Sequence, residues 1–121
     1  TQGVSSAASD VYKRQSLDDT LGQLIANERQ AAALFVNDDL RQARALAGEK
    51  ARFRTIETQA ADTHLQKIKA GQVDAAEVGA LYLDILRDMK GINSHLVGAA
   101  AYPLLARHGE LLPSRLREAG N

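Results

Sequence analysis

The sequence predicts an all-α protein, and three observations support this fold class. Residues that favour helices, chiefly Ala, Leu, Glu, Gln, Arg and Lys, dominate the chain, whereas aromatic residues make up 4% and proline occurs twice. Apolar residues recur every three or four positions over long stretches, as they do along one face of a helix. Runs of β-branched and aromatic residues typical of strands are absent from the sequence.

Composition and charge narrow the classes of function. The 121 residues are 45% hydrophobic and 25% charged, a profile typical of a single folded, soluble domain. Fifteen basic residues balance fifteen acidic ones, so no net charge favours nucleic acid or an anionic membrane. The absence of cysteine excludes disulfides, thiolate zinc sites and cysteine nucleophiles. No apolar run reaches the ~20 residues needed to cross a bilayer, so we expect no transmembrane segment.

The first fifteen residues differ in composition from the rest of the chain. Residues 1–15 are mostly small and polar, carry no helical apolar stripe and do not begin with Met. We expect this segment to be disordered, and we interpret it as a non-native piece joined to the protein during sequence assembly. The missing Met predicts that the natural protein extends further upstream.

From Ser16 onward the sequence predicts helices with defined ends. The first helix is expected over 16–36, with Ser16 as its N-cap and Asp19 completing a capping box. Its apolar positions at helical spacing are Leu17, Leu21, Leu24, Ala31 and Phe35. Asp39 offers an N-cap oxygen to a second helix, and Gly71 is placed to terminate it. The apolar positions of this second helix are Leu40, Ala43, Ala47, Phe53, Ile56, Ala60 and Ile68.

A third helix is expected to begin at Asp74, which forms a capping box with Glu77, and to end before Gly109. Pro103 lies within it and leaves a carbonyl of the preceding turn without its donor, which predicts a kink. The apolar positions of this helix are Val78, Leu81, Ile85, Met89, Ile92, Leu96 and Ala99. The tail, residues 110–121, contains a proline and several charges and is expected to be loosely ordered.

These helices predict an antiparallel three-helix bundle over residues 16–109. The second and third helices are each expected to have about 33 residues, or ~50 Å of length. The loops are short, so neighbouring helices should run antiparallel. Because the first helix is shorter, we expect an upstream helix or a partner surface to cover part of the other two.

Two pairs of residues suggest a metal site. Glu57 precedes His64 by seven residues, and Asp88 precedes His95 by the same interval, so each acid shares a helix face with its histidine. If both faces pointed inward, four nitrogen and oxygen ligands would converge, as at carboxylate–histidine sites of helical bundles. In the alternative interpretation these residues lie on exposed faces and the spacing arises by chance.

The polar stretch LRDMKGINSHL, residues 86–96, is a second candidate site. Asp84, Arg87 and Asp88 are expected to pair with one another within the third helix. The alternative is that Arg87 and Asp88 hold the third helix to the second, at Arg54 or Glu57. The residues expected to make an interhelix or partner contact are Arg87, Asp88, Asn93 and His95.

Signals of catalysis are missing from the sequence. After residue 16 the chain has two serines, and it contains no G-x-S-x-G elbow and no glycine-rich phosphate loop. We therefore expect a protein that is not an enzyme and needs no cofactor.

The stretch LRDMKGINSH, followed by AYPLL and preceded by ETQAADTHLQKIKAG, carries a resemblance to a known family. The chain from about Leu17 to Leu116 resembles the C-terminal PhoU-like domain of bacterial Na+/phosphate cotransporter family proteins. The resemblance implies a three-helix bundle, often present as two in tandem, that regulates phosphate uptake and follows a membrane-embedded transport region.

The same resemblance bears on the metal hypothesis. The third helix of PhoU proteins carries a motif similar to E-R-I-G-D-H, whose carboxylates bind metal clusters. With Ile92 and His95 matched to its Ile and His, Lys90 stands in place of the Glu and Ser94 in place of the Asp. Asn93 replaces the Gly. The resemblance therefore implies the fold and the regulatory role, but not the metal site.

The predicted function is a cytosolic regulatory domain of a sodium-dependent phosphate transporter, on the cytoplasmic side of the inner membrane. It would act through helix contacts with an upstream transport region or with a second PhoU-like copy. Two alternatives stay open: a helical dimerisation module without a connection to phosphate, and a metal-binding bundle that uses Glu57, His64, Asp88 and His95.

Overall fold

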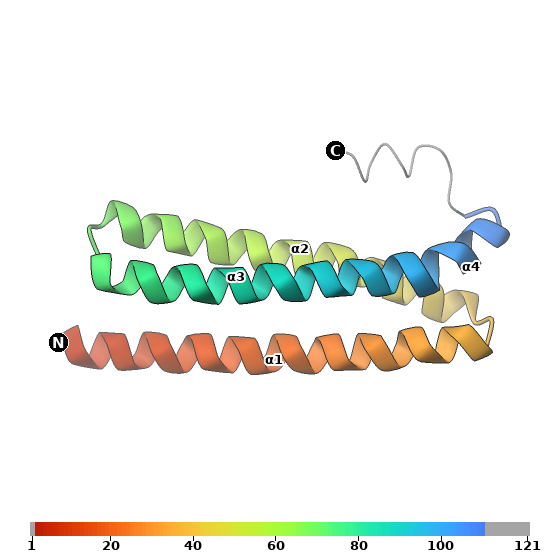
Figure 1. Ribbon diagram of the computed structural model, residues 1–121, viewed down its shortest axis with the longest axis horizontal. Helices are drawn as coiled ribbons and strands as arrows, with labels where there is room; N and C mark the ends of the chain where they lie inside the picture. The colour runs from red at the N-terminus through yellow and green to blue at the C-terminus, as the bar shows by residue number, and fades with distance from the viewer. Residues whose placement is uncertain (1, 111–121) are drawn as a thin grey trace.

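Three long helices pack side by side and confirm the predicted bundle (Figure 1). A computed structural model describes the backbone of residues 2–110, and the side chains of these residues except 2–7, 9 and 73–75. The elements in chain order are α1 (Gln2–Val36), α2 (Leu40–Lys69), α3 (Val73–Leu96), a π-helical turn η1 (Val97–Ala101) and α4 (Tyr102–Arg107).

Helix α1 is longer than the sequence indicates. It begins at Gln2 and has 35 residues, so the expectation of a short first helix is wrong, and so is that of disorder for residues 2–15. Extending an existing helix costs far less than nucleating one, and the Ala, Gln, Lys and Arg of this segment tolerate the extension. Ser16 therefore lies inside α1 rather than at its N-cap, and its carbonyl accepts a hydrogen bond from the Thr20 hydroxyl at 2.7 Å. The non-native origin of residues 1–15 stays a prediction.

The ends of α2 follow the sequence prediction, whereas the start of α3 does not. The Asp39 carboxylate accepts hydrogen bonds from two backbone N–H groups at the start of α2, at 3.0 and 3.2 Å. Gly71 has φ +77° and terminates α2. The chain turns so tightly there that α3 begins at Val73, with Gln72 at the N-cap position. Asp74 thus lies within the first turn of α3, and its prediction as the N-cap is wrong.

The predicted kink at Pro103 is present. Pro103 has no backbone N–H, and the preceding residues form the π-helical turn η1 before the chain continues as α4 in a changed direction (Figure 1). Gly109, at φ +74°, ends this segment as expected. Glu110 pairs with Arg44 of α2 at 2.7 Å, and the remainder of the predicted loose tail, residues 111–121, lies outside the described residues.

Helices α1 and α3 run parallel, and α2 runs antiparallel to both. Two side-chain hydrogen bonds join α1 to α3, Tyr82 to Ser16 at 2.7 Å and Asn27 to Asn93 at 2.8 Å. In both pairs the partners are 66 residues apart. A constant separation over eleven residues of α1 fixes a single register between the two helices.

The core is most continuous where α1, α2, η1 and α4 meet. Its buried members there are Ala31, Leu34, Ala43, Leu46, Val97, Ala100, Ala101, Leu104 and Leu105. The predicted apolar faces of α1 and α3 are partly wrong, because Phe35 and Leu81 are 69% and 62% exposed. The inward line of α3 is instead Leu83, Leu86 and Asn93, and it continues into Val97 of η1. The predicted apolar line contains Ile92 and the buried line contains Asn93, the next residue. A shift of one residue turns the inward direction by about 100° around the helix.

Candidate functional site

A buried polar layer joins the three helices at the middle of the bundle. Asn27 of α1 and Asn93 of α3 are 1% and 0% exposed. The Asn27 amide donates to the Asn93 carbonyl oxygen at 2.8 Å and to the Glu49 carboxylate of α2 at 3.1 Å. Gln23 donates to the Asn27 side-chain oxygen at 2.9 Å. The bond between Asn27 and Asn93 is buried and the other two are part-buried, so the layer favours one arrangement of α1, α2 and α3.

The sequence predicted Asn93 as a contact residue but missed Asn27, its partner. The available signal was the position of Asn27 in a line with the buried residues Leu24, Ala31 and Leu34 of α1. An amide at an otherwise apolar line needs a partner, since an unpaired buried polar group costs about 1–3 kcal/mol. The Asn93 side-chain amide nitrogen itself has no hydrogen-bond partner among the described residues.

A second polar contact holds α3 to α2 at Glu57. Lys90 donates to one carboxylate oxygen of Glu57 at 2.9 Å, and Arg87 donates to the other at 3.4 Å. Lys90 supplies the shorter of the two bonds. Both interpretations of Arg87 are therefore present, because Arg87 also lies 3.9 Å from Asp84 within α3. Asp88 is exposed and has no described contact with α2.

The contact makes Glu57 more acidic than a free glutamate. The hydrogen bond from Lys90 lowers the pKa of Glu57 most; the charges of Lys90 and Arg87 and the bond from Arg87 add to this, while burial opposes it. A carboxylate whose pKa is lower in the folded state stabilises the fold above its unfolded pKa of about 4.3. That contribution is lost as the pH falls through the folded pKa.

We therefore expect Glu57→Gln to lower the free energy of unfolding at pH 7 by about 1 kcal/mol. The difference from the unmodified chain should stay constant from pH 7 to about pH 5 and shrink below about pH 4.3. Urea unfolding followed by circular dichroism at several pH values measures it. A difference that persists unchanged to pH 2 would contradict the assignment of Glu57 as the titrating group.

The four metal candidates do not come together. Glu57 is engaged by Lys90 and Arg87, whereas His64 packs against Gly79 of α3. Asp88 and His95 are exposed on α3. Among the described residues no three His, Cys, Asp or Glu side chains are close enough to hold a metal ion.

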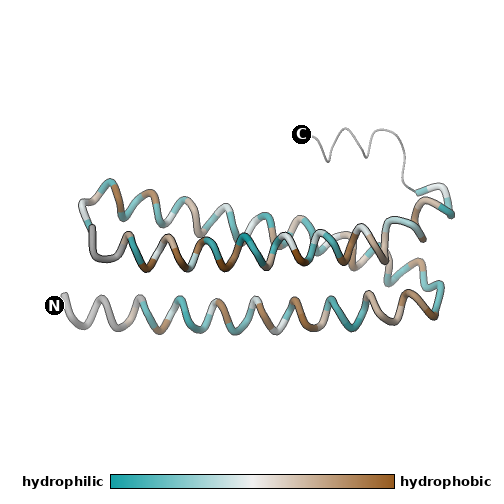
Figure 2. The backbone as a smooth tube through the Cα atoms, in the orientation of Figure 1, coloured by the Kyte–Doolittle hydropathy of each residue, from teal (hydrophilic) through white to brown (hydrophobic). Residues whose placement is uncertain are grey.

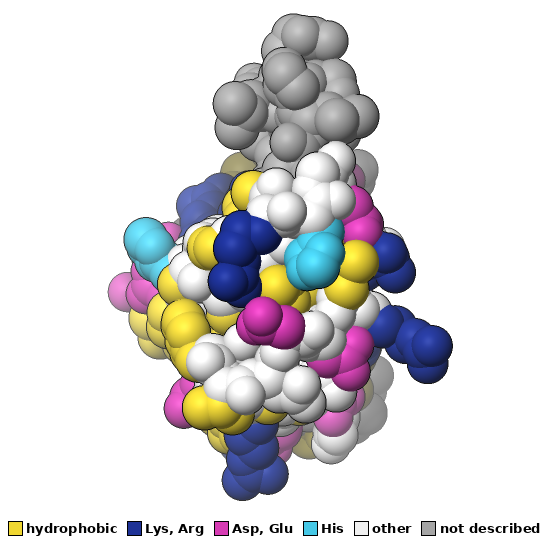
Figure 3. Space-filling model, turned by 90° about the vertical axis from the view of Figure 1, so that its right-hand side faces the viewer, with side chains coloured by type: hydrophobic (Ala, Val, Ile, Leu, Met, Phe, Trp, Pro, Cys, Tyr) yellow, Lys and Arg dark blue, Asp and Glu magenta, His cyan; other side chains and the backbone are white. Residues whose placement is uncertain are grey.

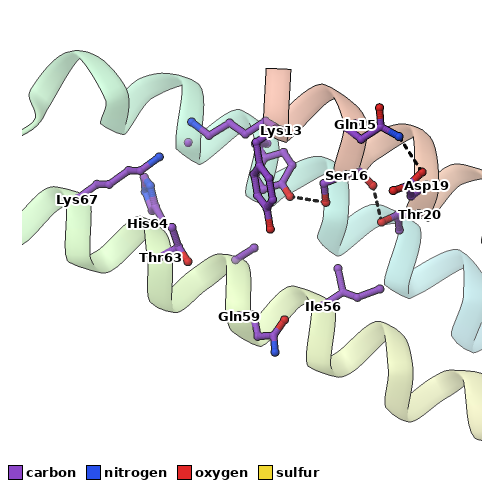
Figure 4. Close-up of a pocket in the computed structure, with 14 residues that line it drawn as sticks. Lys13, Gln15, Ser16, Asp19, Thr20, Ile56, Gln59, Thr63, His64 and Lys67 are labelled. Atoms are coloured by element: carbon purple, nitrogen blue, oxygen red, sulfur yellow. Dashed lines mark hydrogen bonds between the residues drawn. The ribbon is translucent and has the colours of Figure 1, made fainter. Parts of the chain in front are cut away.

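A cavity of about 350 Å³ lies between the three helices toward the start of α1 (Figure 4). Tyr82 donates to the Ser16 hydroxyl at its wall, and Lys13 and Lys67 approach its rim. Burial, followed by the charge of Lys67, lowers the pKa of Lys13.

The end of the bundle that carries α4 and the α1–α2 loop shows no concentration of one charge. Basic, acidic and histidine side chains are interspersed on this face (Figure 3). Arg107 pairs with Asp38 at 3.4 Å across the same end. None of the helices within residues 2–110 is long and apolar enough to cross a membrane.

Comparison with known proteins gives one consistent similarity. The chain is similar to part of YjbB. It is 33% identical over 91 residues to YjbB of Salmonella typhimurium strain LT2, which covers 75% of this chain and 17% of that protein. The Escherichia coli K12 and Shigella flexneri proteins of the same name are each 31% identical over 96 residues, or 79% of this chain and 18% of theirs.

YjbB is named as an inorganic phosphate export protein in all three organisms. The chain thus spans less than a fifth of the length of the curated relatives it matches. No family model and no solved structure matches it. The similarity relates this bundle to a region of a phosphate transport protein, in keeping with the phosphate connection expected from the sequence.

Proposed function

We propose that the chain is a non-catalytic regulatory domain of an inorganic phosphate transport protein and acts through contacts between helices. The observation that carries this proposal is the similarity of three quarters of the chain to a region of YjbB. The resemblance of the α3 segment to PhoU-like domains adds the regulatory role, the sodium-dependent class of transporter and a place on the cytoplasmic side of the inner membrane.

The side chains of α3 support action by contact rather than by chemistry. On the inward side, Asn93 belongs to the buried polar layer, and Arg87 and Lys90 hold Glu57 of α2. These groups are engaged in fixing the helices. On the outward side, Asp88, Ile92 and His95 are exposed and available to a partner. The bundle is therefore suited to act through contacts made by its outward surface.

The proposal is tested by supplying the chain in trans. Cells would carry the Salmonella YjbB with the region that matches this chain deleted, and phosphate export would be measured with and without the chain co-expressed. Ile92→Arg, on the exposed side of α3, should remove the effect of the chain. Asp62→Arg, on the exposed side of α2, is the matched control and should keep it. An export rate that the chain leaves unchanged, although the chain is folded and expressed, would overturn the proposal.

A further inference from the structure

Helix α3 presents a largely exposed line of apolar and polar side chains. The line consists of Leu81, Ile85, Asp88, Ile92 and His95. Intervals of four and three residues keep these positions on one face, as in helices that pair side by side. Leu81 and Ile92 are 62% and 51% exposed, Asp88 and His95 are exposed, and Ile85 is half-buried.

This line faces away from the rest of the bundle. Asn93 points into the interior, and Arg87 and Lys90 point toward Glu57 of α2. Ile92 precedes Asn93 by one residue, so its side chain lies about 100° around the helix from the interior. It lies on the side of α3 opposite to that of Lys90, which faces Glu57 of α2. Ile92 is accordingly 51% exposed.

Helix α1 widens the same apolar surface. It runs parallel to α3, and apolar residues recur along both helices (Figure 2). Leu21 and Ile25 of α1 are 44% and 42% exposed. Leu21 follows Asp19, which lines the cavity between the three helices, by two residues and so lies about 160° around α1 from that cavity. An apolar surface that extends over two helices is larger than single exposed side chains would account for.

The order of polar groups on α3 is self-complementary. Asp88 stands four residues before Ile92, and His95 stands three residues after it. From the N-terminal to the C-terminal side the order is acid, Ile92, histidine. In a helix that runs the opposite way the order is histidine, Ile92, acid. An antiparallel second α3 therefore places its His95 opposite Asp88 and its Asp88 opposite His95, with the two Ile92 side chains between them.

We infer that this face pairs two copies of the chain around a two-fold axis near Ile92, with Asp88 of each copy opposite His95 of the other. A two-fold interface uses the same patch twice and so requires this kind of self-complementarity. The chain carries no net charge, so two copies approach without long-range repulsion. The inference rests on the proposed action through helix contacts and names its partner as a second copy.

Sedimentation of the purified chain over a range of concentrations tests the pairing. We expect dimers at about 100 µM and at least a 10-fold weaker association for Ile92→Arg, since 10-fold corresponds to about 1.4 kcal/mol. Asp88→Arg and His95→Asp should each weaken association by a similar factor, because the first removes the carboxylate opposite His95 and the second places two carboxylates opposite one another. The double variant Asp88→Arg/His95→Asp should recover the association of the unmodified chain, because the pairs become complementary again.

Asp62→Arg, an exposed change of the same kind on α2, should leave association unchanged. All these positions are exposed or half-buried on the surface, and circular dichroism would show that each variant keeps its helices. A chain that stays monomeric at millimolar concentration, or a double variant as weak as the single ones, would overturn the inference. Association needs no phosphate, so this result is independent of the export measurement that tests the proposed function.

Discussion

Replacing Asn93 with alanine is expected to lower the free energy of unfolding by about 2–3 kcal/mol. The change removes the acceptor of the 2.8 Å bond from Asn27 and leaves that buried amide with one partner fewer. It also opens a void at a position that is 0% exposed, where neighbouring side chains refill the space only in part. Urea unfolding at fixed protein concentration, followed by circular dichroism, measures the loss.

Asn37→Ala is the matched control, because Asn37 is an exposed asparagine in the loop before α2. It should change stability by less than about 0.5 kcal/mol. Asn27→Ala and the double variant complete a cycle, in which the loss in the double variant should fall short of the sum of the single losses by about 0.5–3 kcal/mol. Equal midpoints for Asn93→Ala and Asn37→Ala would contradict the role of the buried layer.

Replacing Gly79 with alanine should destabilise the bundle by about 1–2 kcal/mol, although the same change stabilises most helices. A Cβ atom at Gly79 would lie 2.6 Å from Nδ1 and 3.2 Å from Cε1 of the His64 ring. The ring of α2 packs directly on the backbone of α3 there, so either the ring or the helix must shift. The midpoint of thermal or urea unfolding reports the change.

The control for Gly79 is another helical glycine, one that has open space beside it. A Cβ atom added at Gly48 of α2 would meet no side chain or neighbouring helix within 4 Å, so Gly48→Ala should raise stability by up to about 1 kcal/mol. Adding His64→Ala to the Gly79 variant should recover part of the loss, because the atoms in conflict are gone. If Gly79→Ala and Gly48→Ala are equally stabilising, the close approach of α2 and α3 at His64 is not present in solution.

The helix ends that depend on local chemistry were predictable from the sequence. Asp39, Gly71, Pro103 and Gly109 act through their own backbone or the next few residues, and all four do what their type predicts. The start of α1 was not predictable in this way. No local signal distinguishes a segment that merely extends an anchored helix from one that stays disordered.

The inward faces of α1 and α3 were harder to predict, because their buried lines contain polar and small residues. Counting apolar residues excludes Asn27, Asn93 and Gly79 and selects a neighbouring line that includes Ile92 and Leu81. The buried asparagines are tolerated only because they pair with each other across 66 residues of sequence. That pairing is a property of the folded bundle and cannot be read from either helix alone.

The candidate site was predicted in part. Arg87 and Glu57 carry opposite charges on neighbouring helices, so a contact between them could be considered from the sequence. The structure contains this contact. The sequence comparison identified Lys90 only as the residue that replaces the Glu of the PhoU motif. In the structure Lys90 makes the shorter bond to the Glu57 carboxylate. Which face of α3 carries Asp88 and His95 outward depends on the register of the bundle, which the spacing of charges does not determine.

We propose that this bundle regulates phosphate transport by contact. The rate of phosphate export should be measured in cells that carry Salmonella YjbB without its matching region, with and without this chain. We predict that the chain moves the rate toward that of full-length YjbB and that Ile92→Arg loses the effect while Asp62→Arg keeps it. An export rate that is the same with and without the folded chain would contradict the claim.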